Sequence, residues 1–156
     1  MIEIVDYKTE YREHFKTLNL EWIQKYFVVE PADEYVLSNP QSSILDRGGL
    51  IFFAKNGLEI VGTCALQKVD DKTYELAKMA VNKKQQGLGI GRMLMEKSIQ
   101  KAKELQLEKL VLYSNSKLER ALGLYHKYDF RAVSLDNHPT KRADIKMELN
   151  LKPGKI

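Results

Sequence analysis

The 156-residue sequence contains a single cysteine, Cys64, so it cannot form an intrachain disulfide framework, and we expect this residue to lie in the core. Its three histidines, His14, His126 and His138, share no ligand spacing with Cys64, which excludes a Cys/His zinc site, and we expect no metal. No apolar run approaches the ~20 residues of a membrane-spanning helix, and residues 1–13 lack the apolar core of a signal peptide. We therefore expect a cytoplasmic protein with no membrane partner.

Charge of one sign is not in large excess, because 25 basic residues face 21 acidic ones. A basic nucleic-acid-binding segment is usually more lopsided, so we do not expect nucleic acid to be a partner. The charges are unevenly distributed: residues 1–50 carry nine acidic and five basic side chains, whereas residues 83–156 are basic. One end of a site could therefore suit a cation and another an anion, although solvated helix faces are the alternative.

The length predicts one domain, which we place at residues 1–151, followed by a tail, residues 152–156, that frays. Apolar residues recur at helical spacing, which predicts helices over residues 10–26, 32–37, 92–105 and 116–128. Alternating or continuous apolar runs predict strands over residues 2–7, 50–54, 58–66, 74–81, 109–113, 130–135 and 144–149. Asn56-Gly57 predicts a hairpin turn, and residues 39–43 predict a loop. This order predicts a mixed α+β domain with helices packed on a central sheet.

A glycine-rich turn, residues 86–91, joins a predicted strand to a predicted helix. The free backbone N–H groups and the dipole at a helix N-terminus favour phosphate, and Lys83, Lys84 and Arg92 add positive charge. The turn fits neither the P-loop pattern nor the dinucleotide fingerprint, whose Gly-x-Gly-x-x-Gly spacing is absent. A tight strand-to-helix junction without a ligand is the alternative.

Within this turn, Gln86-x-x-Gly89-x-Gly91 resembles the pyrophosphate-binding motif of the GNAT superfamily of acetyl-CoA-dependent N-acetyltransferases. Residues 75–81 resemble the strand before that motif, and residues 112–115 and 124–130 resemble the last cofactor-side strand and the Tyr-x-Lys-x-Gly-Phe segment. Asp129 stands where that segment usually has glycine, and Asp tolerates a left-handed helix end better than most residues. The resemblance implies a mostly antiparallel central sheet flanked by helices on both faces.

The resemblance also implies which residues bind acetyl-CoA. Backbone amides of the turn would hold the pyrophosphate, from Gln86, Gly87, Leu88, Gly89, Ile90, Gly91 and Arg92. We expect the side chains of Leu88 and Ile90 to pack in the core. The preceding strand, through Met79, Ala80 and Val81, would bind the pantetheine arm, and the amide of Met79 or Val81 would polarise the thioester carbonyl.

Asn115 would also contact the pantetheine arm, although a turn or helix N-cap is an equally good interpretation.

Two residues match the catalytic positions of the family. Glu75 would act through water as the base that takes a proton from the amine, unless it is merely an exposed strand residue. Tyr125 would be the acid that protonates the leaving thiolate and would contact the cofactor, although a core tyrosine would show the same pattern.

The resemblance places the acceptor pocket at the first two helices and the loop between them. Trp22, Tyr26, Glu30 and Asp33 lie there, within the acidic segment, and their carboxylates and aromatic rings would suit a cationic amine. Aromatic residues of this kind also commonly belong to a core.

These features predict the transfer of an acetyl group from acetyl-CoA to a primary amine of a small molecule or of a peptide or protein, in a ternary complex. The alternatives are a non-catalytic acyl-CoA-binding sensor of the same fold and, less well supported, an enzyme associated with nucleic acid. A homodimer is compatible with this fold.

Overall fold

The computed structural model describes residues 1–151, so the predicted fraying of residues 152–156 lies outside the described residues. The described strands form one sheet in the order β1-β2-β3-β4-β5-β7-β6. Their bounds are β1 (Ile2–Asp6), β2 (Leu50–Asn56), β3 (Glu59–Lys68), β4 (Thr73–Val81), β5 (Lys109–Ser114), β6 (Arg131–Val133) and β7 (Ile145–Asn150). Only β4 and β5 are parallel among the described pairs.

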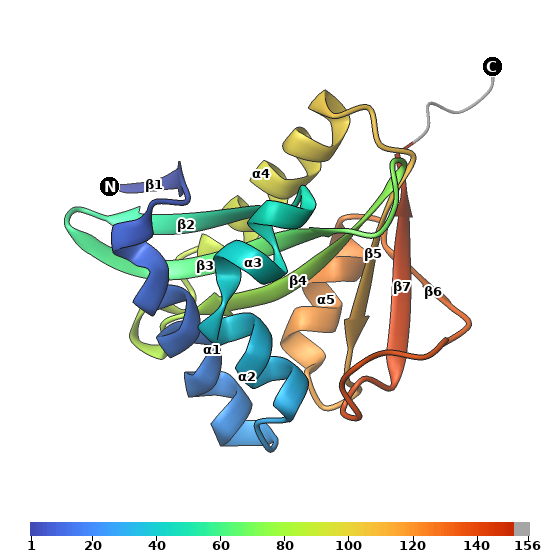
Figure 1. Ribbon diagram of the computed structural model, residues 1–156, viewed down its shortest axis with the longest axis horizontal. Coiled ribbons are helices and arrows are strands. Elements are labelled where there is room, and N and C mark those ends of the chain that lie inside the picture. Colours follow the sequence, from blue (N-terminus) through green and yellow to red (C-terminus); the bar gives the residue numbers. More distant parts are fainter. Residues whose placement is uncertain (152–156) are drawn as a thin grey trace.

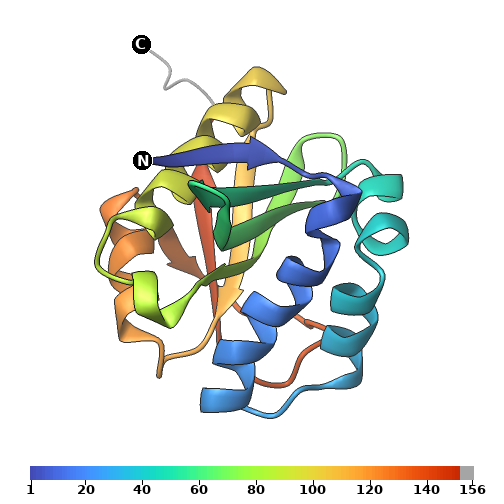
Figure 2. The same cartoon turned by 90° about the vertical axis from the view of Figure 1, so that its left-hand side faces the viewer.

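Helices cover both faces of this sheet (Figures 1 and 2). The α-helices are α1 (Arg12–Tyr26), α2 (Pro31–Ser38), α3 (Pro40–Ser43), α4 (Ile90–Glu104) and α5 (Glu119–Lys127). Three short 3-10 helices accompany them, η1 (Thr9–Tyr11), η2 (Leu45–Arg47) and η3 (Lys83–Gln85). Helices α1 and α2 lie on one face of the sheet and α4 and α5 on the other. The expected mixed α+β class, with a mostly antiparallel sheet and helices on both faces, is confirmed.

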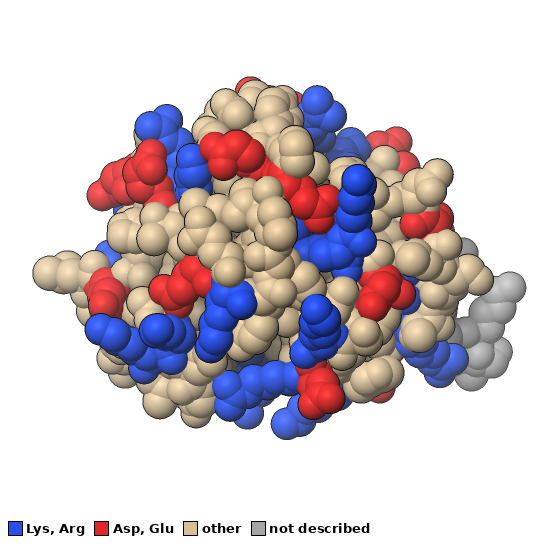
Figure 3. Space-filling view, turned by 90° about the horizontal axis from the view of Figure 1, so that it is seen from below, with Lys and Arg blue, Asp and Glu red and all other residues tan. Residues whose placement is uncertain are grey.

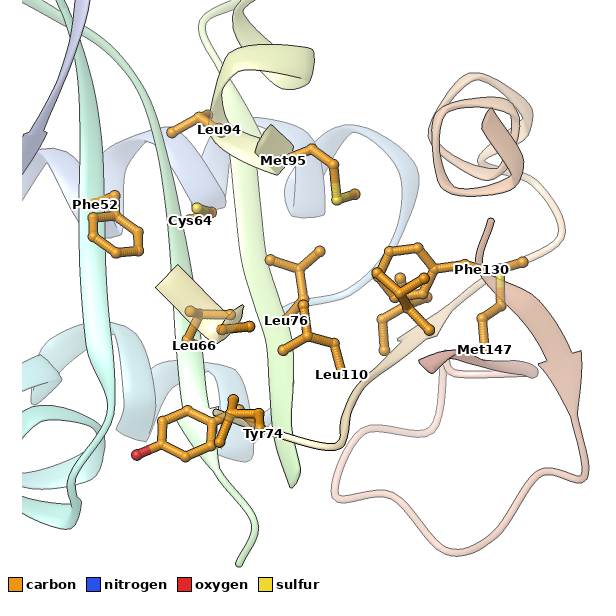
Figure 4. Packing of buried hydrophobic residues seen from close by; sticks show 14 of the residues in the cluster. Phe52, Cys64, Leu66, Tyr74, Leu76, Leu94, Met95, Leu110, Phe130 and Met147 are labelled. Atoms are coloured by element: carbon orange, nitrogen blue, oxygen red, sulfur yellow. The ribbon is translucent and has the colours of Figure 1, made fainter. Parts of the chain in front are cut away.

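Strand β2 shows why the sheet is buried on both faces. Its side chains alternate, so that Phe52 packs toward α4 while Ile51 and Phe53 pack toward α1. The cluster on the α4 face includes Cys64 and Phe130, both at most 1% exposed (Figure 4). The prediction that Cys64 belongs to the core is therefore confirmed, and burial raises the pKa of its thiol to about 12.

Two of the differences from the predicted boundaries have a clear local cause. Residues 40–43 of the predicted loop, residues 39–43, form helix α3 instead, because Pro40 starts the helix with its φ already fixed. Helix α5 begins at Glu119, three residues later than predicted, because Asn115 and Asp144 hold residues 116–117 in a turn. Asp129 adopts a left-handed φ of 71°, as its replacement of a glycine predicts.

Candidate active site

The sheet opens between β4 and β5, and this gap defines the cleft of the protein. The two strands pair only where residues 73–75 meet residues 109–111. Beyond that point β4 follows β3 to Val81, while β5 follows β7 to Ser114. A bulge accompanies the separation: the register with β3 shifts, and Lys78 adopts a φ of 55°. Both strands therefore turn an unpaired backbone edge toward the cleft, which an extended ligand could pair with.

The amides along β4 alternate in direction, and this alternation selects which of them face the cleft. The N–H of Asn82 donates to the carbonyl of Val61 in β3 at 2.8 Å. Because successive amides of an extended strand point to opposite sides, those of Val81 and Met79 point away from β3 and toward the cleft. By the same alternation the amide of Ala80 points toward β3, so Ala80 can contact a ligand in the cleft only through other atoms.

The glycine-rich turn closes one end of the cleft. Gly87 and Gly89 adopt φ values of 88° and 79°, which favour glycine. The carbonyl of Gly89 accepts the first hydrogen bond of α4, so the amides of residues 90–92 have no partner within the helix. Together with the helix dipole they form a site that favours phosphate. Arg120 donates to the Gln86 side chain at 3.3 Å, which brings another positive charge to the turn.

The two side chains of this turn that we expected in the core behave differently. Ile90 is 1% exposed and packs against β3 at Gly62, where a Cβ would lie 2.9 Å from it. Leu88 is 58% exposed, so its predicted core packing is wrong. Leu88 lies between two left-handed glycines at the tip of the turn, whereas Ile90 begins the helix face that packs on the sheet.

A cavity of about 1100 Å³ fills the cleft and reaches both faces of the sheet. Its walls include α5 and the glycine-rich turn on the α4 face, and α1, α2 and the loop of residues 134–144 on the other face. The charged side chains that line it are Glu75, Lys78, Arg92, Lys117, Glu119, Arg120, Lys127 and Arg142. Basic groups thus outnumber acidic ones in the lining. Figure 3 shows Lys and Arg side chains gathered over the lower half of one molecular face.

Glu75 lies at the wall of this cavity and pairs with His138, which the sequence analysis did not assign to the site. The Nε2 atom of His138 lies 3.3 Å from a Glu75 carboxylate oxygen, and both side chains are largely buried. The backbone N–H of Thr140 donates to Nδ1 of His138 at 3.2 Å, so the ring proton lies on Nε2 and is donated to Glu75. The Tyr113 ring lies against the imidazole, with centroids 4.1 Å apart and planes tilted by 35°, which restricts the rotation of the imidazole.

Tyr125 lines the same cavity from α5. Its ring packs against Phe130, with centroids 6.0 Å apart, and joins the edge of the core cluster. Burial, followed by the nearby Cys64, raises the pKa of Tyr125 to about 12. The hydroxyl therefore keeps its proton at neutral pH and is available as a donor, since no hydrogen bond within residues 1–151 engages it.

The structure gives Glu30 and Asp33 a different environment from the one we predicted. Asp33 is fully buried and receives two hydrogen bonds of 2.6 Å from the Arg142 guanidinium and one of 3.0 Å from Lys78. The carboxylate of Glu30 accepts the backbone amides of Lys141 and Arg142 at 2.7 and 3.3 Å. Neither acid lines the cavity, so neither offers a free charge to a cationic amine there.

The pKa of Asp33 reflects this network. Burial raises it, but the hydrogen bonds from Arg142 and the Glu30 amide, together with the charge of Lys78, outweigh the burial. The pKa of Asp33 is therefore well below its ordinary value, and the carboxylate holds Lys78 and Arg142 in place.

The other predicted site residues lie around the cavity as follows. Trp22 and Tyr26 line it from α1, and the Arg142 guanidinium lies 5.5 Å from the centre of the Trp22 ring. Tyr26 is 48% exposed and so does not belong to the core. Asn115 also lines the cavity, but its amide donates to the Arg142 carbonyl and its oxygen accepts the Lys117 amide, which fits the turn interpretation.

Sequence reasoning missed three residues of the site, His138, Lys78 and Arg142. The first and third lie in the long connection between β6 and β7, which has no periodicity to place its side chains. A left-handed lysine inside a strand has no sequence signature either.

Two further features of residues 1–151 concern groups of metal-ligating side chains and membrane-spanning helices. No three His, Cys, Asp or Glu side chains of residues 1–151 lie close enough to hold a metal ion together. No described helix is both long and apolar enough to cross a bilayer.

Comparison with known proteins agrees with this geometry. Residues 15–130 match the profile of the acetyltransferase (GNAT) family. The chain is 30% identical over 108 residues to the uncharacterized N-acetyltransferase YvbK of Bacillus subtilis, an alignment that covers 67% of this chain and 70% of YvbK.

Solved structures show the same similarity. An acetyltransferase of the GNAT family from Staphylococcus aureus Mu50 superposes with a TM-score of 0.89 at 27% identity, covering 97% of this chain and all of that one. A GNAT acetyltransferase from Elizabethkingia anophelis, solved with acetyl-CoA bound, superposes with a TM-score of 0.71 at 27% identity, covering 96% and 98% of the two chains.

Proposed function

The chain belongs to the acetyltransferase (GNAT) family, and from this premise we propose that it transfers the acetyl group of acetyl-CoA to a primary amine by direct attack in a ternary complex. The observation that carries the proposal is the cleft itself. Its unpaired strand edges lead to a helix N-terminus with free amides, and its cavity of about 1100 Å³ has room for two substrates.

The residues present fit acetyl-CoA. The two left-handed glycines remove the side chains that would keep a pyrophosphate from the amides of residues 90–92. The basic side chains of Arg92 and Arg120 supply charge for the phosphates. The cleft-facing amides of Met79 and Val81 would hold the pantetheine arm as a neighbouring strand would, and one of them would polarise the thioester carbonyl. When bound, acetyl-CoA supplies the activated acetyl group.

The half of the cleft that α1 and α2 cover, here called the acceptor half, supplies the base. Most primary amines are protonated at neutral pH, so a proton must leave before nitrogen can attack. Glu75 is the carboxylate that lines the cavity on the face covered by α1 and α2, and His138 holds one of its oxygens with an Nε2–H hydrogen bond. Glu75 would take the amine proton, directly or through a water molecule.

The half of the cleft that the glycine-rich turn and α5 line, here called the cofactor half, supplies the hydrogen-bond donor for the leaving sulfur. Tyr125 enters the cavity from α5 with its hydroxyl protonated, because burial raises its pKa to about 12. Such a hydroxyl would stabilise the departing thiolate by a hydrogen bond and provide the proton that it finally takes up.

The glycine turn gives the sharpest test of this assignment. We expect Gly89→Glu to weaken acetyl-CoA binding at least about tenfold, because a carboxylate would face the phosphates and a left-handed φ of 79° strains any side chain. Isothermal titration calorimetry at moderate salt measures this loss.

Gly57→Glu is the matched control. Gly57 has a comparable φ of 63°, open space around it, and a position in the β2–β3 turn away from the cavity. If the wild type does not bind acetyl-CoA, the proposed function is wrong. If both variants bind it as the wild type does, the glycine turn is a structural junction and not the pyrophosphate site.

A further inference from the structure

The acceptor half of the cleft carries charges opposite to those expected for a simple cationic amine. On the face covered by α1 and α2, the cavity lining includes the cations Lys78 and Arg142, both bound to Asp33 of α2, and the carboxylate of Glu75. The acidic partners Asp33 and Glu30 lie behind the two cations and do not reach the cavity. The charges of these four side chains sum to zero. Because only the two cations line the cavity, positive charge faces the acceptor.

Lys78 is the better placed of the two cations. Its ammonium group donates one hydrogen bond to Asp33 and has no other partner within residues 1–151, so two of its three N–H groups are available. Both oxygens of Asp33 already accept from Arg142, so the charge of this one buried carboxylate is shared between two cations. An incoming anion would therefore find an ammonium that is only partly neutralised.

The bulge brings Lys78 to the same side of the sheet as the base. Side chains of a regular strand alternate, and residues three apart point to opposite faces. The extra residue at the left-handed Lys78 breaks this alternation, so Lys78 and Glu75 both lie on the face that α1 and α2 cover. A carboxylate that takes a proton and an ammonium that binds an anion thus stand along one strand, about 10 Å apart in backbone rise.

From this juxtaposition we infer that the acceptor is an amine that carries its own carboxylate, that is, a free amino acid. The inference rests on the proposed function and specifies its acceptor. The ammonium group of the amino acid would lie toward Glu75 and its carboxylate toward Lys78 and Arg142. Trp22, Val36 and Pro139 add apolar surface to a lining that also contains Gln67 and Thr140, so amino acids with apolar side chains are the first probes.

Three amines that differ only at the carboxylate test this inference: phenylalanine, phenylalaninamide and 2-phenylethylamine. We expect kcat/KM for phenylalanine to exceed that for the other two by about ten- to a hundredfold, the range of hydrogen bonds to charged groups. Release of CoA thiol at saturating acetyl-CoA measures all three. The same set is repeated with leucine, leucinamide and 3-methylbutylamine, in case the ring is too large.

Lys78→Met separates recognition from structure. We expect it to remove most of the preference for the amino acid over its amide, because a purely structural defect would lower kcat/KM for both amines equally. Lys72→Met, at an exposed turn residue outside the cavity, is the matched control and should keep the preference.

Equal or better turnover of the amides and simple amines by the wild type would overturn the inference and leave the proposed function standing, as would an unchanged preference in Lys78→Met. If acetyl-CoA binds but no amine in either set releases thiol, the inference fails, whereas a wild type that does not bind acetyl-CoA refutes the proposed function itself.

Discussion

Replacement of Glu75 by glutamine is expected to lower kcat by about 10²–10⁴-fold, the usual contribution of a general base. Glutamine keeps the shape of the side chain but cannot take a proton from the amine. Because Glu75 lies on the acceptor half of the cleft, away from the glycine turn, the affinity for acetyl-CoA should stay close to that of the wild type. Steady-state kinetics with calorimetry of acetyl-CoA binding would measure both quantities.

The pH dependence distinguishes lost chemistry from lost structure. As the pH rises, more of the amine loses its proton without help, and the base becomes less necessary. The deficit of Glu75→Gln should therefore shrink steadily at alkaline pH, whereas a variant with a distorted cleft would be impaired at every pH. A kcat equal to that of the wild type at neutral pH would show that Glu75 is not the base.

His138 provides a graded control for the same step. His138→Ala removes the Nε2–H donor that holds Glu75 and should reduce kcat by about tenfold, since the carboxylate loses its orientation but not its charge. His138→Gln keeps an N–H donor near that position and should recover part of the loss. Equal losses in the two variants would argue against a positioning role for His138.

Tyr125→Phe should have a smaller effect on kcat than Glu75→Gln, about ten- to a hundredfold. The pKa of Tyr125 is raised to about 12, so transfer of its proton to a thiolate is energetically unfavourable. Hydrogen bonding to the thiolate therefore supplies most of its contribution to catalysis. The loss should be smaller still with an acetyl thioester whose leaving thiol is more acidic. An undiminished kcat would show that Tyr125 has only a packing role at the wall of the cavity.

The sequence was informative wherever a local rule decides the structure. Apolar periodicity placed the helices and strands to within a few residues, since each face must be buried against the sheet. The left-handed conformation of Asp129 followed from its replacement of a glycine. The free amides at the start of α4 were also predictable, because the amides at a helix N-terminus are set by the backbone and not by distant partners.

The predictions for the acceptor pocket failed because of contacts between residues far apart in the chain. Asp33 and Glu30 lie in an acidic segment, but their partner Arg142 is 109 residues from Asp33. Local composition therefore predicted a negative pocket, whereas long-range ion pairs leave positive groups facing the cavity. His138 was missed for the same reason, since 63 residues separate it from Glu75.

Loss of the Asp33 carboxylate is expected to destabilise the fold more than any other substitution at this site. Asp33→Ala leaves Lys78 and Arg142, whose side chains are only 11% and 12% exposed, without their shared partner. Removing one member of a buried ion pair costs about 3–5 kcal/mol of unfolding free energy. Urea unfolding at pH 7 measures the change, and Glu34→Gln, an exposed carboxylate on the same helix, should leave the midpoint nearly unchanged.

The sign of the pH dependence follows from the lowered pKa of Asp33. A carboxylate whose pKa is lower in the folded protein than in the unfolded chain stabilises the fold above its unfolded pKa of about 3.9. This stabilisation is lost as the pH falls from that value toward the folded pKa. The difference in unfolding free energy between the wild type and Asp33→Asn should therefore be constant near neutral pH and decrease below about pH 4.

A double-mutant cycle separates the ion pair from simple packing. If Asp33 stabilises the fold through Arg142, the double variant Asp33→Asn/Arg142→Gln should lose clearly less than the sum of the two single losses, because neither buried charge is then left alone. Additive losses would mean that each side chain contributes only its own packing. In that case the position of Lys78, and with it the positive wall of the acceptor half, would have to be maintained by the bulge of β4 without Asp33.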